Sequence, residues 1–91
     1  MSVARGVESH ASLAPIAARR AHEALEALRV LVAVELVAAV RALRLAKHVP
    51  TGAGARRLYD AAVPLLDPEL SDRALHPDVE EARQLVLRWA A

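Results

Sequence analysis

The residues best suited to chemistry lie in a short polar segment, Val7-Glu-Ser-His-Ala-Ser12, near the start of the chain. The carboxylate of Glu8 and the imidazole of His10 belong to the side-chain types that act as general acids and bases. The segment precedes a predicted helix, and a helix N-terminus favours anionic ligands. The same string also has the composition of an ordinary N-cap region. Glu8 and His10 are therefore candidate catalytic residues, with helix capping as the alternative interpretation.

Glu35 is a second unusual ionisable residue, because it interrupts the apolar run over residues 30–40. An ionised carboxylate in an apolar environment is costly unless a partner compensates its charge. The nearest cations in sequence, Arg29 and Arg41, are each six residues away and lie off its helical face. We therefore expect Glu35 to pair with a cation from another chain, in a structural salt bridge without a catalytic role.

Several other classes of site are not predicted. The four histidines have no metal-ligand spacing and the chain has no cysteine, so no metal site is expected. No Gly-x-Gly-x-x-Gly motif or Walker loop is present. A net charge of +1 with scattered charged residues gives no footprint for nucleic acid. The small basic stripe of Arg41, Arg44 and Lys47 is interpreted as complementing the negative end of a helix dipole.

The sequence predicts neither a secretory signal nor a membrane span. The first ten residues contain no apolar core of the kind that a signal peptide has. The longest strongly apolar stretch, residues 30–40, is well short of the roughly 20 residues needed to cross a bilayer. We expect a soluble, cytoplasmic protein without a membrane partner.

Hydrophobic patterning predicts an all-α chain with one long core helix and two shorter helices. The predicted elements are an irregular lead-in over residues 1–11, a long helix over 12–47, and shorter helices over 55–66 and 77–90. Pro15 suits the first turn of the long helix, and Pro77 suits the first position of the last one. Pro50, with the glycines that follow it, is expected to end the long helix.

The long helix is too apolar for this chain to bury alone. Residues 30–40 are apolar on every side, which is typical of a helix inside a multi-helix core. Their β-branched residues would also suit a buried strand, but the flanking helix formers and the absence of Gly and Pro over 16–49 favour a helix. Such a helix spans roughly 50 Å, whereas a globule of this length has a radius of gyration of about 12 Å. We expect a single helical segment that forms part of a multi-chain helical bundle.

Four segments, in the same order, resemble the histidine and aromatic amino-acid ammonia-lyases. They are Glu8-Ser-His-Ala-Ser-Leu-Ala-Pro-Ile-Ala-Ala-Arg-Arg20, Val34-Glu-Leu-Val-Ala-Ala39, Gly54-Ala-Arg-Arg-Leu-Tyr-Asp60 and Asp72-Arg-Ala-Leu-His-Pro-Asp78. The last is similar to that family's Asp-Arg-x-Leu-x-Pro-Asp. The resemblance covers most of residues 7–88 and corresponds to the C-terminal part of the family.

The resemblance implies an all-helical, tetrameric enzyme that eliminates ammonia with an MIO (4-methylidene-imidazol-5-one) electrophile made from an internal Ala-Ser-Gly. This chain contains no Ala-Ser-Gly and lacks the N-terminal loop that carries the family's tyrosine base. We therefore expect it to hold no cofactor and to be inactive alone, with the MIO on a larger ammonia-lyase-like partner. Because Met1 lies only seven residues before Glu8, we expect the small subunit of a split lyase or aminomutase, in a hetero-oligomer built on a tetrameric core.

The resemblance also implies roles for individual residues. Glu8 matches a family glutamate that lies near the amino group or side chain of a small amino-acid substrate, and His10 is a second candidate beside it. Val7 replaces a glutamine and Ser9 replaces an aspartate, which removes hydrogen-bonding groups next to Glu8. The pocket is therefore expected to accept a different substrate or none. Glu35 also falls on a family glutamate, which supports the structural pairing proposed for it.

Three interpretations of the chain stay open. The chain is either a catalytic small subunit or a non-catalytic scaffold or regulatory helical subunit derived from a lyase, and an excised fragment that folds only by association is a third possibility. The changes at Val7 and Ser9 favour the scaffold, whereas retention of Glu8 and His10 favours the enzyme. The amino-acid substrate, the stoichiometry and the choice between elimination and 2,3-migration also stay open.

Overall fold

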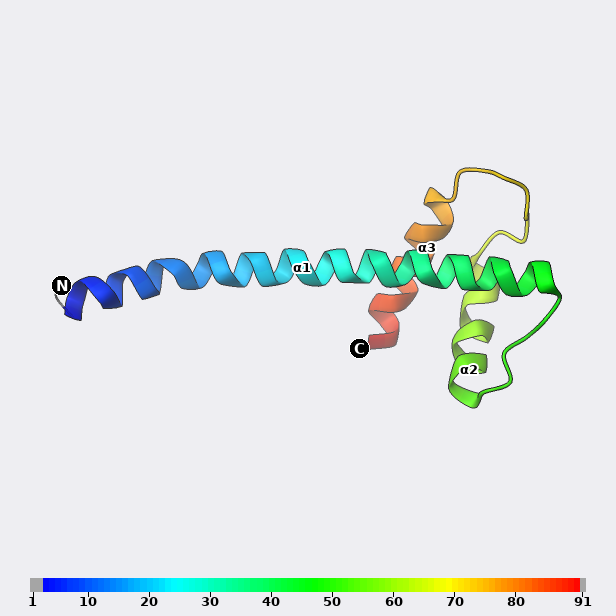
Figure 1. Ribbon diagram of the computed structural model, residues 1–91, viewed down its shortest axis with the longest axis horizontal. Coiled ribbons are helices and arrows are strands. Elements are labelled where there is room, and N and C mark those ends of the chain that lie inside the picture. The colour runs from blue at the N-terminus through cyan, green and yellow to red at the C-terminus, as the bar shows by residue number, and fades with distance from the viewer. Residues whose placement is uncertain (1–2, 91) are drawn as a thin grey trace.

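The computed structural model describes the backbone of residues 3–90 and the side chains of residues 13–89. This part of the chain is all-α, as predicted. Its elements are α1 (Val3–Ala46), α2 (Ala53–Ala62), the 3-10 turn η1 (Val63–Leu65) and α3 (His76–Ala90) (Figure 1). The chain measures 66 × 30 × 17 Å with a radius of gyration of 19.7 Å, against about 12 Å for a compact globule of this length. It is a rod with a small helical body at one end.

The start of α1 differs from the prediction. The helix begins at Val3, so residues 3–11 are helical where an irregular lead-in was expected, and residues 1 and 2 lie outside the described part. Pro15 consequently lies inside the helix, where it removes one backbone hydrogen bond. The alanines, leucines, arginines and glutamates that follow are good helix formers, so the helix continues through this defect.

The end of α1 comes at Ala46, before the proline and glycines that were expected to stop it. Lys47 adopts the left-handed conformation, with a φ of 53°. Its N–H donates to the carbonyl of Arg44 at 3.1 Å, and the N–H of His48 donates to the carbonyl of Leu43 at 3.0 Å. These two bonds form a Schellman motif, which normally uses glycine at the left-handed position.

The second predicted helix is divided in two. The structure has α2 from Ala53 to Ala62, followed by η1, rather than one helix over 55–66. Pro64 lies at the start of η1, and a proline disfavours the helical conformation of the residue before it. The third helix agrees with the prediction to within one residue, because α3 begins at His76.

The core lies between one face of the C-terminal half of α1 and the helices α2 and α3. Figure 1 shows α3 crossing the C-terminal half of α1, and α2 lying beyond that crossing toward the end of α1. The buried apolar residues are Ala33, Val37, Val40, Ala62, Leu66, Ala82 and Leu85. Only one side of α1 is covered in this way, and every side chain over residues 13–25 is exposed.

Candidate functional site

The two candidate catalytic residues, Glu8 and His10, lie in the N-terminal part of α1. Their side chains lie outside the described residues. Because α1 begins at Val3, the segment that contains them is within a helix and not before its N-terminus, so the expected anion-binding position is absent there. Successive helical residues turn by about 100°, which places positions 8 and 10 about 200° apart around the axis. Positions 8 and 10 therefore lie on different sides of the helix backbone.

Glu35 is exposed on α1. Its neighbours one turn away are apolar and include Leu31, which is 55% exposed, and Ala38. No ion pair of Glu35 is found within residues 13–89. The pairing with a cation from another chain stays a prediction.

Arg41 and Arg44 have a structural use that the sequence analysis missed. The Arg41 guanidinium donates to the carbonyl oxygens of Glu69, Leu70 and Ser71 at 3.1, 3.2 and 3.1 Å. Arg44 donates to the carbonyl oxygens of Val63, Leu66 and Asp67 at 2.9, 3.2 and 2.9 Å. The two arginines thus bind the loop over residues 66–75 to α1. Their spacing shows that they share a face, but a sequence cannot show which carbonyl groups face them.

The segment Asp72-Arg-Ala-Leu-His-Pro-Asp78 forms the other end of this loop. Asp78 is 4% exposed. One oxygen of its carboxylate forms an ion pair with Nη2 of Arg73 at 2.8 Å. The other oxygen accepts a hydrogen bond from the backbone N–H of Asp67 at 3.4 Å. The hydrogen bond that Arg73 donates to the Asp78 carboxylate raises the pKa of Arg73 above its ordinary value. Arg73 also donates to the carbonyls of Glu69 and Asp67 at 3.0 and 3.2 Å. In this chain, the motif therefore fixes the entry into α3.

A second group of charges joins α3 to α1. Arg83 lies 2.7 Å from Glu80 of its own helix and 3.8 Å from Glu26 of α1. Glu26 also pairs with Arg29. The hydrogen bond from Arg83 lowers the pKa of Glu80, with a second contribution from Gln84. This group has ordinary surface ion-pair geometry.

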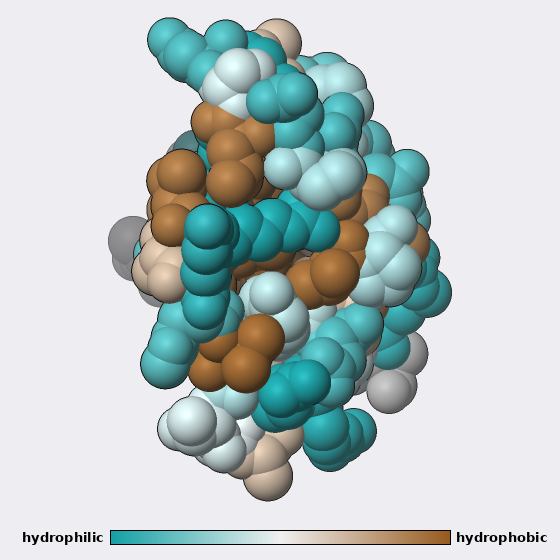
Figure 2. Space-filling view, turned by 90° about the vertical axis from the view of Figure 1, so that its right-hand side faces the viewer, coloured by the Kyte–Doolittle hydropathy of each residue, from teal (hydrophilic) through white to brown (hydrophobic). Residues whose placement is uncertain are grey.

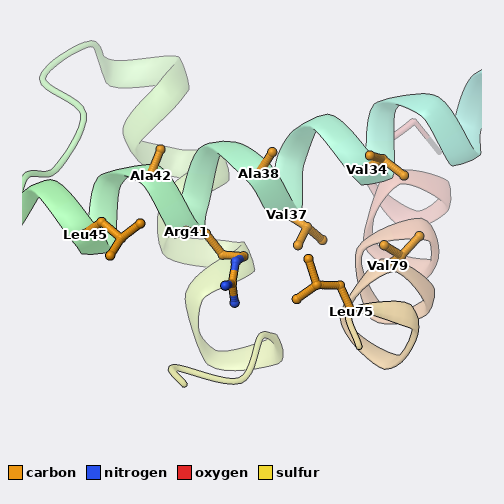
Figure 3. A pocket seen from close by; sticks show the side chains of 8 residues that line it. All are labelled: Val34, Val37, Ala38, Arg41, Ala42, Leu45, Leu75 and Val79. Atoms are coloured by element: carbon orange, nitrogen blue, oxygen red, sulfur yellow. The ribbon is translucent and has the colours of Figure 1, made fainter. Parts of the chain in front are cut away.

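The two hollows between the helices are apolar. One, of about 330 Å³, is lined by Val34, Val37, Ala38, Arg41, Ala42, Leu45, Leu75 and Val79. Figure 3 shows Val37 and Leu75 pointing toward each other across it, while Arg41 extends away from α1. The other, of about 170 Å³, lies between α1 and α2 and contains Tyr59. In the part that the structure describes, no group of three His, Asp or Glu side chains is placed to hold a metal.

The exposed apolar side chains of α1 are the clearest functional feature of the described residues. Large apolar side chains that are at least 40% exposed are Leu13, Ile16, Leu25, Leu28, Val30, Leu31, Val32, Val34, Leu45, Val49 and Trp89. Figure 2 views the end of the molecule at which α1 terminates and shows separate hydrophobic patches between hydrophilic side chains. Exposed apolar surface of this extent marks interaction sites in soluble proteins. None of the described helices combines the length and hydrophobicity of a transmembrane span.

Comparison with known proteins gives one family. The sequence profile described as "Aromatic amino acid lyase" matches residues 1–63. The chain is 30% identical to the histidine ammonia-lyase of Rattus norvegicus over 87 residues, which are 96% of this chain and 13% of that protein. It is 31% identical to the histidine ammonia-lyase of Legionella pneumophila (strain Corby) over 80 residues, 88% of this chain and 16% of that protein. The chain thus spans only a small part of the length of these relatives. No solved structure matches it.

Proposed function

Because the chain belongs to the aromatic amino acid lyase family, we propose that it is the small subunit of a two-component ammonia-lyase or aminomutase. Its sequence contains no Ala-Ser-Gly, so its own residues do not fit an MIO group. A larger ammonia-lyase-like chain would carry that electrophile and the catalytic base. The complex would act on a small amino acid in the cytoplasm, and this chain would be inactive alone.

The observation that carries this proposal is the uncovered apolar surface of α1. Val37 and Val40 are at most 2% exposed, whereas Leu25 and Val32 on the same helix are 45% and 40% exposed. Burial of one leucine side chain contributes about 2 kcal/mol, so a partner that covers this helix gains substantial free energy. A larger lyase chain supplies helices of the kind that would complete such a core.

Glu8 would be the contribution of this chain to the active site. Every side chain over residues 13–25 is exposed, and Figure 1 shows the N-terminal part of α1 projecting away from α2 and α3. This projection would carry Glu8 into the partner, where its carboxylate would contact the substrate ammonium or accept its proton. His10, on a different side of the helix, would be a secondary candidate.

The test is reconstitution of the full chain with the larger lyase chain from the same source. Ammonia and unsaturated acid are measured with histidine, tyrosine and phenylalanine, and a β-amino acid product would reveal 2,3-migration. Glu8→Gln is expected to reduce kcat at least tenfold without changing the amount of complex in size-exclusion chromatography. Glu23→Gln is the matched control, since Glu23 is exposed on the same helix. Unchanged turnover by Glu8→Gln would refute the catalytic role.

The second candidate function is a non-catalytic scaffold or regulatory subunit. One observation favours it: Val7 and Ser9 stand where the family has polar partners of the glutamate. On this alternative, the complex assembles and the larger chain is stabilised, but both Glu8→Gln and His10→Gln leave turnover unchanged.

A further inference from the structure

One continuous face of α1 lies opposite its buried side. Ala33, Val37 and Val40 face the body, and the helical period places another set of residues on the reverse side. We call this set the distal face; it comprises Leu13, Ala17, Arg20, Ala24, Ala27, Leu28, Leu31, Glu35, Ala38 and Ala42, all exposed. Its members recur every three or four residues, as in the contact stripe of a helix that packs on another helix.

The distal face has two charged residues, Arg20 and Glu35, and is otherwise apolar. They are fifteen positions apart, which is about 22 Å along a helix axis. They are too distant to pair within one chain. Each charge interrupts an apolar surface, so burial of this face requires a complementary charge from whatever covers it.

The distal face is complementary to itself when one copy is reversed. With two antiparallel copies related by a two-fold axis between Ala27 and Leu28, Arg20 of each lies opposite Glu35 of the other. The same register places each leucine of the distal face opposite an alanine: Leu13 opposes Ala42, Leu31 opposes Ala24, and Leu28 opposes Ala27. Large residues opposite small ones allow two helices to interdigitate closely. Such a contact is the self-complementary patch that two-fold symmetry requires.

We propose that two copies of this chain pack antiparallel through the distal face, held in register by two reciprocal Arg20–Glu35 ion pairs. A parallel pair in register would place Arg20 against Arg20 and Glu35 against Glu35, and like charges in such contacts oppose assembly. Charged pairs at helix contacts set partner choice and orientation in this way. The proposal concerns contacts between copies of this chain and does not rest on a larger lyase subunit.

Sedimentation equilibrium of the full chain, over micromolar to millimolar concentrations, is the first test. A monomer–dimer equilibrium is expected, and Glu35→Arg or Arg20→Glu alone should weaken it on the order of tenfold. An equimolar mixture of these two variants, and the double variant, should restore dimerisation because opposite charges again face each other. Glu23→Arg is the control, since position 23 lies off the distal face. Circular dichroism confirms that each variant keeps its helix content.

Cysteine cross-linking tests the antiparallel register independently, because the chain has no cysteine of its own. Ala17→Cys and Ala38→Cys are exposed substitutions that the register places opposite each other, while the two copies of either position lie about 31 Å apart. A mixture of the two variants should form a disulfide-linked dimer, and neither variant should do so alone. A monomer at every concentration, failure of the charge-reversed mixture to associate, or self-linkage of Ala17→Cys would each overturn the proposal.

Discussion

Val40→Ala should show how strongly α2 and α3 bind the C-terminal half of α1. Val40 is 1% exposed, so the substitution loses about 1.6 kcal/mol for two buried carbon groups at about 0.8 kcal/mol each. A residual cavity of about 50 Å³ adds about 1 kcal/mol, and the higher helix propensity of alanine returns about 0.5 kcal/mol. The free energy of unfolding is therefore expected to fall by about 2 kcal/mol, which lowers Tm by about 10 °C in a chain of this size.

Val30→Ala is the matched control for this experiment. Val30 lies in the same helix but is 42% exposed, so the smaller loss of burial is nearly offset by the gain of about 0.5 kcal/mol in helix propensity. Neither valine belongs to the distal face, so self-association does not distinguish the two variants. Thermal and urea unfolding, followed by circular dichroism at one chain concentration, measure both. Equal losses of stability in the two variants would refute the packing of the body on this side of α1.

Two further predictions concern the end of α1 and the surface of α3. Lys47→Gly should raise the free energy of unfolding, measured with urea, by about 0.5 kcal/mol. The left-handed φ of 53° costs lysine about 1 kcal/mol, and the greater flexibility of glycine in the unfolded chain cancels about half of that gain. Lys47→Ala should give no increase. Glu80 has a pKa lowered from 4.5 by Arg83, so its stabilisation should be present above pH 4.5 and disappear as the pH falls through the lowered value. The stability difference between the wild type and Glu80→Gln should therefore shrink on acidification, and a constant difference would contradict this assignment.

The helical elements could be predicted because hydrophobic patterning is strong in each of them, but their ends depended on local conformations. Pro15 suited a first helical turn, yet α1 begins twelve residues earlier, although Gly6, Ser9 and Ser12 are weak helix formers. The end of α1 depends on the left-handed Lys47, a conformation that lysine rarely adopts. The second helix ends at Ala62 and not at residue 66, because Pro64 in η1 disfavours the helical conformation of the residue before it.

The side-chain chemistry was less predictable than the helices. Asp78 lies in the first turn of α3, where a negative charge favours the helix dipole, and it is also buried against Arg73. The spacing of these two residues is visible in the sequence; their contact depends on the turn between them. The three-residue basic stripe was assigned to the helix dipole, whereas Arg41 and Arg44 bind loop carbonyls that only the folded chain brings near. The roles of Glu8 and His10 stay predictions that reconstitution tests.

The projecting N-terminal part of α1 is the place where the uncovered chain should be most sensitive to proteases. Helices in proteins owe most of their stability to tertiary packing of one face, and every side chain over residues 13–25 is exposed. We therefore expect limited proteolysis to cut this part first, while the body around Val37, which is 2% exposed, stays folded. A partner that covers the projection would protect it, so the rate of cleavage would report assembly.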